Sequence, residues 1–117
     1  MMNKENVIED KSFNFAIRIV NLYKYLNYTK KEHILSAQLL KSGTSIGANI
    51  CEGERGQSRA DFNAKFNIAL KEANETQYWL RLLYATNYID EKEYTSMEND
   101  INEIVSILTA IVKKTNN

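Results

Sequence analysis

Apolar residues recur along the chain at intervals of three and four, which is the spacing of one face of an α-helix. In the first segment two neighbouring apolar stripes predict a helix over about residues 11–27. One stripe consists of Phe15, Ile19, Leu22 and Leu26, and the other of Phe13, Ile17 and Val20. So wide an apolar face predicts burial among several neighbouring helices. Ser12 or Asp10 is the expected N-cap.

Two further helices follow short polar segments. The second helix, over about residues 30–52, is expected to begin at the capping-box pattern TKKE of residues 29–32. The third helix, over about residues 58–86, begins at the similar pattern SRAD, whose serine can accept a hydrogen bond from a backbone N–H. Asn87 is the expected stop of this third helix.

The fourth helix is predicted over about residues 90–114, with Asp90 and further acidic residues where the helix dipole favours them. Its apolar positions form an unbroken heptad seam made by Tyr94, Met97, Ile101, Ile104, Leu108 and Ile111. The chain contains no proline, and the predicted loops are short. Short loops between long helices make neighbours antiparallel, so we expect an all-α, up-down-up-down four-helix bundle as a single domain over residues 1–117.

Charge and cysteine content restrict the function classes. Fifteen basic and fifteen acidic residues cancel, unlike the composition of a strongly basic nucleic-acid-binding protein, so contact with RNA or DNA requires a local patch. A single cysteine favours a reducing compartment. The N-terminus has no signal-peptide core, and no apolar run approaches the roughly 18 residues that cross a bilayer. We expect a cytoplasmic, bacterial protein without a membrane partner.

The segment SGTSIGANICEGERGQS, residues 42–58, carries all four glycines and the only cysteine. It matches neither the P-loop nor the dinucleotide-binding glycine pattern. Cys51 is expected near a helix C-terminus, which disfavours a thiolate, so it is interpreted as a small buried hydrophobe. With His33 as the only histidine, the chain offers no metal site, cofactor site or catalytic constellation. We expect no enzymatic activity.

The glycines themselves favour close helix packing. Gly43 and Gly47 lie one helical turn apart, beside Ala48, and small residues on one face allow another helix to approach. Each interior glycine costs about 1 kcal/mol relative to alanine, which tight packing can offset. Close approach to a ligand is the alternative. Gly53 and Gly56 are expected to supply a left-handed C-cap to the second helix.

The segment of residues 42–83 resembles the signature of the 23S rRNA intervening-sequence protein family, also called the four-helix bundle protein family. The pattern is a small-residue run with Ser-Ile and Ala-Asn-Ile, a Glu-Gly pair, a basic turn and a Phe-bearing helix. Its residues here are Ser42, Ser45, Ile46, Ala48, Asn49, Ile50, Glu52, Gly53, Arg55, Ser58, Phe62, Phe66, Ala69 and Glu75. Gly43 and Cys51 depart from the family's usual alanine, small residue for small residue.

The resemblance implies a helical bundle without enzymatic activity. Family members are encoded within ribosomal RNA insertions or elsewhere in bacterial genomes, and their role is largely unknown. Relatives with the same fold are accessory proteins of diversity-generating retroelements, which form ring-like homopentamers and contact nucleic acid and a reverse transcriptase. The resemblance therefore implies a homo-oligomer, with a pentamer favoured, and RNA or DNA as a candidate partner.

Three groups of residues are candidate functional features around the third helix. Basic residues flank the turn before it and form a candidate nucleic-acid patch of Lys41, Arg55, Arg59 and Lys65. Asn49 and Glu52 are expected to form a structural polar network, with a ligand or RNA contact as the alternative. Aromatic residues near its end either fill the end of the bundle or form a subunit interface, namely Tyr78, Trp79, Tyr84 and Tyr88.

Two hypotheses for function follow. The first is a non-enzymatic oligomeric bundle that acts as a nucleic-acid-associated accessory or scaffold protein. The alternative is a pure protein–protein interaction module, for which charge reversal at Arg55 would have no effect and Trp79→Ala would disrupt assembly.

Overall fold

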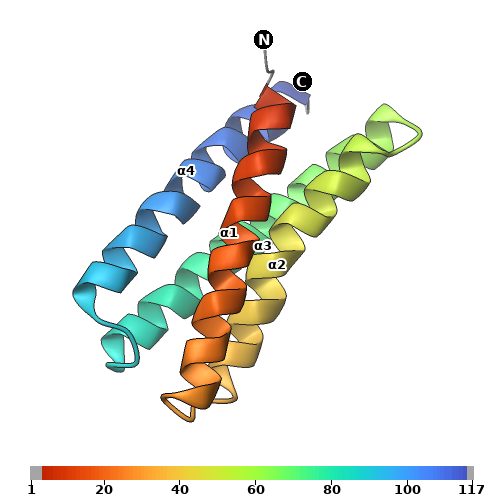
Figure 1. Ribbon diagram of the computed structural model, residues 1–117. Coiled ribbons are helices and arrows are strands. Elements are labelled where there is room, and N and C mark those ends of the chain that lie inside the picture. The colour runs from red at the N-terminus through yellow and green to blue at the C-terminus, as the bar shows by residue number, and fades with distance from the viewer. Residues whose placement is uncertain (1–3, 116–117) are drawn as a thin grey trace.

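The computed structural model describes residues 4–115, with side chains from residue 7 onward. Four α-helices form an antiparallel up-down-up-down bundle (Figure 1), which confirms the predicted all-α fold. They are α1 (Lys4–Tyr28), α2 (Leu35–Glu54), α3 (Arg59–Ala85) and α4 (Glu91–Thr115). Each helix packs against the next one along the chain, and α1 also packs against α4, so α1 lies diagonally across the core from α3.

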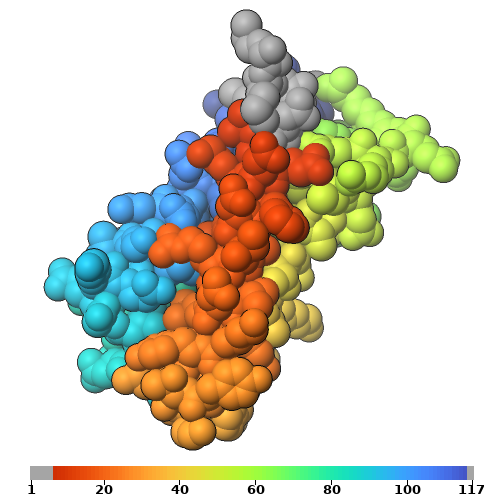
Figure 2. All heavy atoms as spheres, viewed as in Figure 1, coloured from red at the N-terminus to blue at the C-terminus, as the bar shows by residue number. Residues whose placement is uncertain are grey.

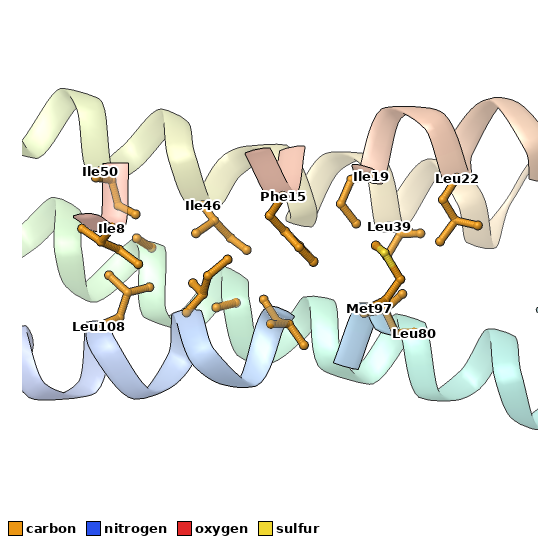
Figure 3. Close-up of a cluster of buried hydrophobic side chains, with 14 of the residues drawn as sticks. Ile8, Phe15, Ile19, Leu22, Leu39, Ile46, Ile50, Leu80, Met97 and Leu108 are labelled. Carbon is orange, nitrogen blue, oxygen red and sulfur yellow. The ribbon is translucent and has the colours of Figure 1, made fainter. Parts of the chain in front are cut away.

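The predicted core stripes meet along the axis of the bundle (Figure 3). The Phe15 stripe of α1 is buried and is extended by Ile8, about two turns before Phe15. In α4 the heptad seam is buried from Met97 to Ile111, while Tyr94 at its start is half-buried. Burial of each large aliphatic side chain stabilises the fold by about 1.5–3 kcal/mol.

The start of α1 differs from the prediction. The helix begins at Lys4 rather than near residue 11, so Asp10 and Ser12 lie inside it and neither is the N-cap. The buried Ser12 hydroxyl donates to the Glu9 carbonyl at 3.0 Å instead. The helix begins earlier because Ile8 is also buried in the core, on the same side of α1 as Phe15.

The predicted capping box of the second helix is also wrong, because α2 begins at Leu35. The Thr29 amide donates to the Tyr25 carbonyl and so completes the end of α1. Glu32 does not reach back to Thr29. Its carboxylate instead accepts from the backbone N–H groups of Ile34, Leu35 and Ser36 at 3.1, 3.0 and 2.7 Å. Burial raises the pKa of Glu32, but these hydrogen bonds outweigh burial and the net pKa is lowered.

Both ends of α3 and the start of α4 follow the prediction closely. The Ser58 side chain accepts from the Asp61 N–H at 3.0 Å, and the Asp90 carboxylate accepts from the Glu93 N–H at 2.8 Å. Asn87 has φ 69° and ends α3 in the left-handed conformation. The Tyr88 N–H then donates to the Leu83 carbonyl at 2.9 Å, which satisfies the last turn of α3.

Close contacts at glycine join α2 to its two neighbours. A Cβ placed on Gly43 would lie 2.7 Å from the Ile19 side chain of α1, and one on Gly47 would lie 3.3 Å from the Ser12 hydroxyl. Gly53 faces α3, where a Cβ would lie 2.8 Å from the Phe66 ring. The glycines therefore hold α2 close to both α1 and α3.

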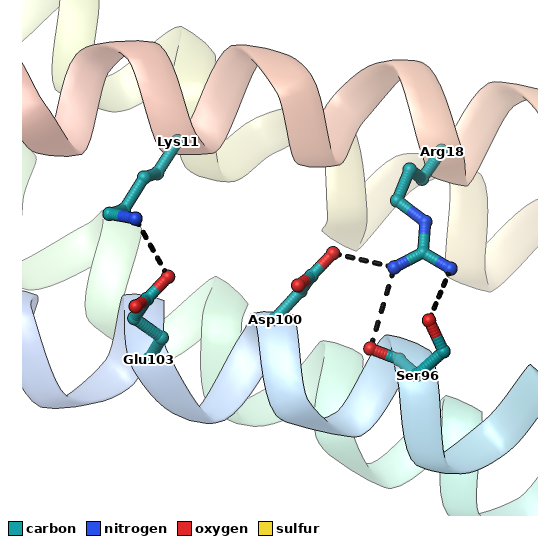
Figure 4. Close-up of polar contacts among 5 residues, drawn as sticks. All are labelled: Lys11, Arg18, Ser96, Asp100 and Glu103. Carbon is teal, nitrogen blue, oxygen red and sulfur yellow. Dashed lines mark hydrogen bonds and ion pairs between the residues drawn. The ribbon is translucent and has the colours of Figure 1, made fainter.

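Polar side chains link the first and last helices across a looser seam (Figure 4). Arg18 of α1 pairs with Asp100 of α4 at 2.6 Å and donates to the Ser96 hydroxyl at 2.8 Å. About two turns earlier along α1, Lys11 pairs with Glu103 at 2.9 Å. All four charged groups are partly exposed, so these links close the seam at the surface rather than in the core.

Candidate functional site

The α2–α3 turn projects away from the ends of α1 and α4 (Figure 1). Gly53 lies inside α2, Arg55 follows its last residue, and no glycine of the described chain has a positive φ. The expected left-handed C-cap at Gly53 or Gly56 is therefore wrong. Gly53 is required for packing against Phe66, and a Cβ on Gly56 would lie 2.9 Å from that of Asp61. These contacts make the turn compact.

Three of the four predicted patch residues surround this turn. Arg55 and Arg59 are exposed, and Lys65 is half-buried on the first turns of α3. Lys41 is exposed but lies fourteen residues before Arg55, about 21 Å away along the α2 axis. The structure therefore does not bring Lys41 together with the other three.

Carboxylates partly neutralise the three cations. The Lys65 ammonium lies 3.4 Å from Glu52, and the Arg55 guanidinium lies 3.8 Å from Glu9. Arg59 forms no ion pair within the described part of the chain. A shallow hollow of about 530 Å³ at the turn is lined by both signs of charge, Arg55 and Lys65 together with Glu52 and Asp61. Arg59 is therefore the patch residue most available to an anion.

Cys51 lies half-buried at the contact of α2 with α1 and binds a carboxylate, so the expectation of a small buried hydrophobe is wrong. Its thiol donates to the Glu9 carboxylate at 3.6 Å. A hydrogen bond with Glu54 lowers the pKa of Glu9, burial raises it, and Cys51 and Arg55 lower it further, so the net pKa is below its usual value. The Glu9 carboxylate of α1 is thus in contact with both Cys51 and Arg55 at the end of α2.

Asn49 and Glu52 make separate contacts. The Asn49 amide donates to the Ser45 carbonyl in its own helix at 2.8 Å, whereas Glu52 pairs with Lys65 of α3. The structure places Ala48 on the exposed side of α2, away from the contacts of Gly43 and Gly47 with α1. Ala48 therefore has no part in the packing of α2 against α1.

The four aromatic residues of α3 and its loop divide into two sets. Tyr84 stacks on Tyr94 of α4 with ring centroids 4.6 Å apart, and Tyr88 packs against the core. These two close the end of the bundle. Tyr78 is 58% exposed and meets Trp79 edge to face, while the Trp79 indole donates to Glu75 at 3.1 Å. Of the four, only Tyr78 is exposed, and Trp79 is half-buried and also packs against the core.

The second apolar stripe of α1 does not enter the core, contrary to expectation. Phe13 is 66% and Ile17 is 48% exposed, and Val20 is half-buried. The Phe15 stripe already fills the side of α1 that faces α2 and α4. Periodicity gave the correct helix, but it could not distinguish a stripe that packs within the chain from one that faces outward.

No arrangement of described residues resembles a catalytic or metal centre. No group of three or more candidate metal ligands comes together in the part of the chain that the structure describes. His33 lies in an exposed turn, with Nδ1 2.7 Å from the Asn27 side-chain oxygen. Among the described helices, none is long and apolar enough to cross a membrane.

Comparison with known proteins gives two matches. The family model described as 23S rRNA-intervening sequence protein matches residues 4–110. The chain is also similar to a crystal structure from Bacteroides thetaiotaomicron, described as a protein of unknown function from the S23 ribosomal protein family. The two share 59% sequence identity with a TM-score of 0.93, over 95% of this chain and 99% of the other. No curated protein matches the sequence.

Proposed function

Because the chain belongs to the 23S rRNA-intervening sequence protein family, we propose that it is a non-enzymatic accessory or scaffold protein that self-associates and holds nucleic acid. The observation that supports self-association is a pair of exposed apolar faces on diagonal helices. The single cysteine suits a reducing compartment, and we propose a cytoplasmic location.

The first apolar face lies on α1. Phe13 and Ile17 are four residues apart and Val20 follows three later, so all three lie on one side of the helix. Phe13 and Ile17 keep much of their apolar surface in water in the single chain. Exposed apolar residues that continue one another in this way mark interaction surfaces.

The second apolar face lies on α3. Ile68 is 41% exposed and Tyr78 is 58% exposed, and Trp79 and Leu82 extend this face toward the end of the helix. Large aromatic side chains are enriched at protein interfaces, where they supply much of the binding energy. Because α1 and α3 are diagonal, the two faces point to opposite sides of the bundle.

Two different faces on opposite sides of one subunit favour a head-to-tail contact. The α1 face of one subunit would pack on the α3 face of the next, and such contacts close into a ring or extend as a filament. We favour a pentameric ring because the retroelement accessory proteins with the same fold form one. A ring would repeat Arg55 and Arg59 once per subunit, and avidity would then strengthen a weak contact with a polyanion.

The solution mass, measured by light scattering after size-exclusion chromatography, tests self-association. We expect a mass of several subunits for the parent and a lower mass for Ile17→Glu. Ile34→Glu is the matched control, because Ile34 is 75% exposed but lies outside both apolar faces. A monomeric parent, or an equal loss of mass in both variants, would contradict the proposal.

Nucleic-acid binding is tested separately, with protein freed of co-purifying nucleic acid. We expect salt-sensitive binding of RNA or DNA that weakens in the double variant Arg55→Ala and Arg59→Ala. Failure of the parent to bind at low salt would contradict this half of the proposal.

The mixed charge of the α2–α3 turn supports a second candidate, a pure protein–protein interaction module. In that case Trp79→Ala would disrupt assembly, while loss of the two arginines would leave assembly unchanged.

A further inference from the structure

The α1–α2 turn presents a second basic surface, at the end of the bundle opposite the α2–α3 turn (Figure 1). We call it the basic tip and define it by Lys24, Tyr28, Lys30, Lys31 and Ile34. Figure 2 shows the side chains of this turn forming the lower end of the molecule in that view. The basic tip shares no residue with the patch around Arg55 and Arg59.

The basic tip combines free positive charge with exposed rings. All three lysines are exposed, and none of them forms an ion pair within the described part of the chain. Tyr28 and Ile34 are each 75% exposed. The only carboxylate in residues 24–34 belongs to Glu32, which is 8% exposed and turned inward onto three backbone N–H groups. No carboxylate of the turn itself therefore faces the lysines, while Asp90 and Glu93 beside the start of α4 line a pocket with Tyr25.

Hydrogen bonds fix the backbone of the turn. The Lys30 N–H donates to the Tyr25 carbonyl at 3.2 Å, and the Glu32 N–H donates to the Leu26 carbonyl at 2.9 Å. Between them Lys31 adopts φ 58°, an uncommon conformation for a residue with a side chain. The Lys30 ammonium lies 6.0 Å from the Tyr25 ring centre. A turn held in this way presents its side chains with little further ordering on binding.

We propose that the basic tip binds single-stranded nucleic acid, with its lysines on the phosphates and Tyr28 stacked on an unpaired base. Aromatic platforms beside a positively charged track are the usual means of binding single strands. A duplex keeps its bases stacked inside and offers Tyr28 no partner. A lipid surface is disfavoured because Ile34 is the only exposed aliphatic residue of the tip, whereas interfacial binding needs a larger apolar face.

Fluorescence anisotropy with a labelled oligo(U) or oligo(dT) of about eight nucleotides, a length suited to one small site, tests the proposal on the full-length chain. Three lysine–phosphate contacts give a slope of log K against log salt of about −2 for a single strand. We expect the double variant Lys30→Gln and Lys31→Gln to reduce that slope to about −0.7, since one contact remains. Tyr28→Ala should weaken binding about tenfold, whereas Tyr28→Phe keeps the ring and should bind like the parent.

Matched controls separate this site from general charge effects and from the proposed function. Lys113→Gln with Lys114→Gln removes the same charge from a pair of exposed lysines at the other end of the bundle. Arg55→Ala with Arg59→Ala removes the α2–α3 patch. The Lys113 and Lys114 control should not change binding of the short oligonucleotide, whereas the arginine variant reports separately on the patch of the proposed function.

Three outcomes would overturn the proposal. The first is that the parent does not bind the oligonucleotide at about 50 mM salt, where phosphate contacts are strong. The second is an equal loss of binding in the Lys113 and Lys30 variants. The third is that the parent binds anionic phosphatidylserine vesicles in place of the oligonucleotide. If only the Arg55 variant loses binding, the basic tip is excluded while the proposed function stands. If only the tip variants lose binding, the inference holds and the Arg55 patch is excluded.

Discussion

Substitution of Gly43 by alanine tests the close approach of α2 to α1. The new Cβ would lie 2.7 to 2.9 Å from three carbon atoms of Ile19, whose side chain is fully buried. Alanine at an interior helix position is better than glycine by about 1 kcal/mol. Overpacking a tight core costs about 1–3 kcal/mol. We therefore expect a net loss of about 1 kcal/mol in the free energy of unfolding.

Gly47 provides the matched control in the same helix. Its new Cβ would lie 3.3 Å from the Ser12 hydroxyl, with the Ser12 carbonyl carbon at 3.6 Å, so a small movement of one side chain relieves the contact. Gly47→Ala gains the same helix propensity and should be neutral or stabilising by about 0.5 kcal/mol. The two variants differ only in the contact that each new methyl meets.

Urea unfolding, followed by circular dichroism and by Trp79 fluorescence at one fixed protein concentration, gives the two free energies. A loss of about 1 kcal/mol corresponds to a decrease in melting temperature of about 4 °C for a chain of this size. In an Ile19→Ala background the obstructing atoms are absent, so Gly43→Ala should become stabilising. The packing argument fails if Gly43→Ala is as stable as Gly47→Ala, or if the Ile19 background leaves its effect unchanged.

Two further substitutions test polar groups of the fold. Glu32→Gln should lower stability by about 1 kcal/mol at pH 7, because a charged acceptor is lost from three backbone N–H groups at the start of α2. Since the folded pKa of Glu32 is lowered, its contribution is present above the ordinary pKa and is lost as pH falls through the lowered value. The stabilities of parent and variant should therefore converge in urea titrations as the pH is lowered through that range. Thr76→Val should cost about 1 kcal/mol by removing the buried hydroxyl that contacts Ser42 at 3.0 Å, and adding Ser42→Ala should recover part of this loss in the same assay. A constant gap across the pH range, or strictly additive losses at Thr76 and Ser42, would contradict these two arguments.

The sequence correctly predicted those features of the fold that depend on a local or periodic pattern. The Phe15 stripe and the heptad from Met97 to Ile111 are buried as predicted, because a helix of regular period turns them to one side. The helix ends at Ser58 and Asn87 were also correct. A side-chain oxygen that accepts a nearby N–H, and a residue tolerant of positive φ, act within a few residues.

The failures occur where several segments compete for the same groups. Thr29 and Glu32 match a capping box, but the Thr29 amide completes α1 and the Glu32 carboxylate faces forward to α2. That error concealed the basic tip, because residues 30–34 were assigned to a helix when they form an exposed turn. Among the candidate site residues, Lys41 was wrongly placed in the basic patch. Its position in the sequence lies near the turn, but a helix separates the two in space.

The salt-bridged seam between α1 and α4 has a consequence for how the bundle assembles. The other helix contacts join consecutive segments, so three hairpin-like units can form locally, and only this seam unites the two ends of the described chain. The links at the surface of this seam are ionic and solvent-facing, and mobile ions weaken such links. The contact between α1 and α4 should therefore form last during folding. It should also open first in local unfolding of the native state, most readily in concentrated salt.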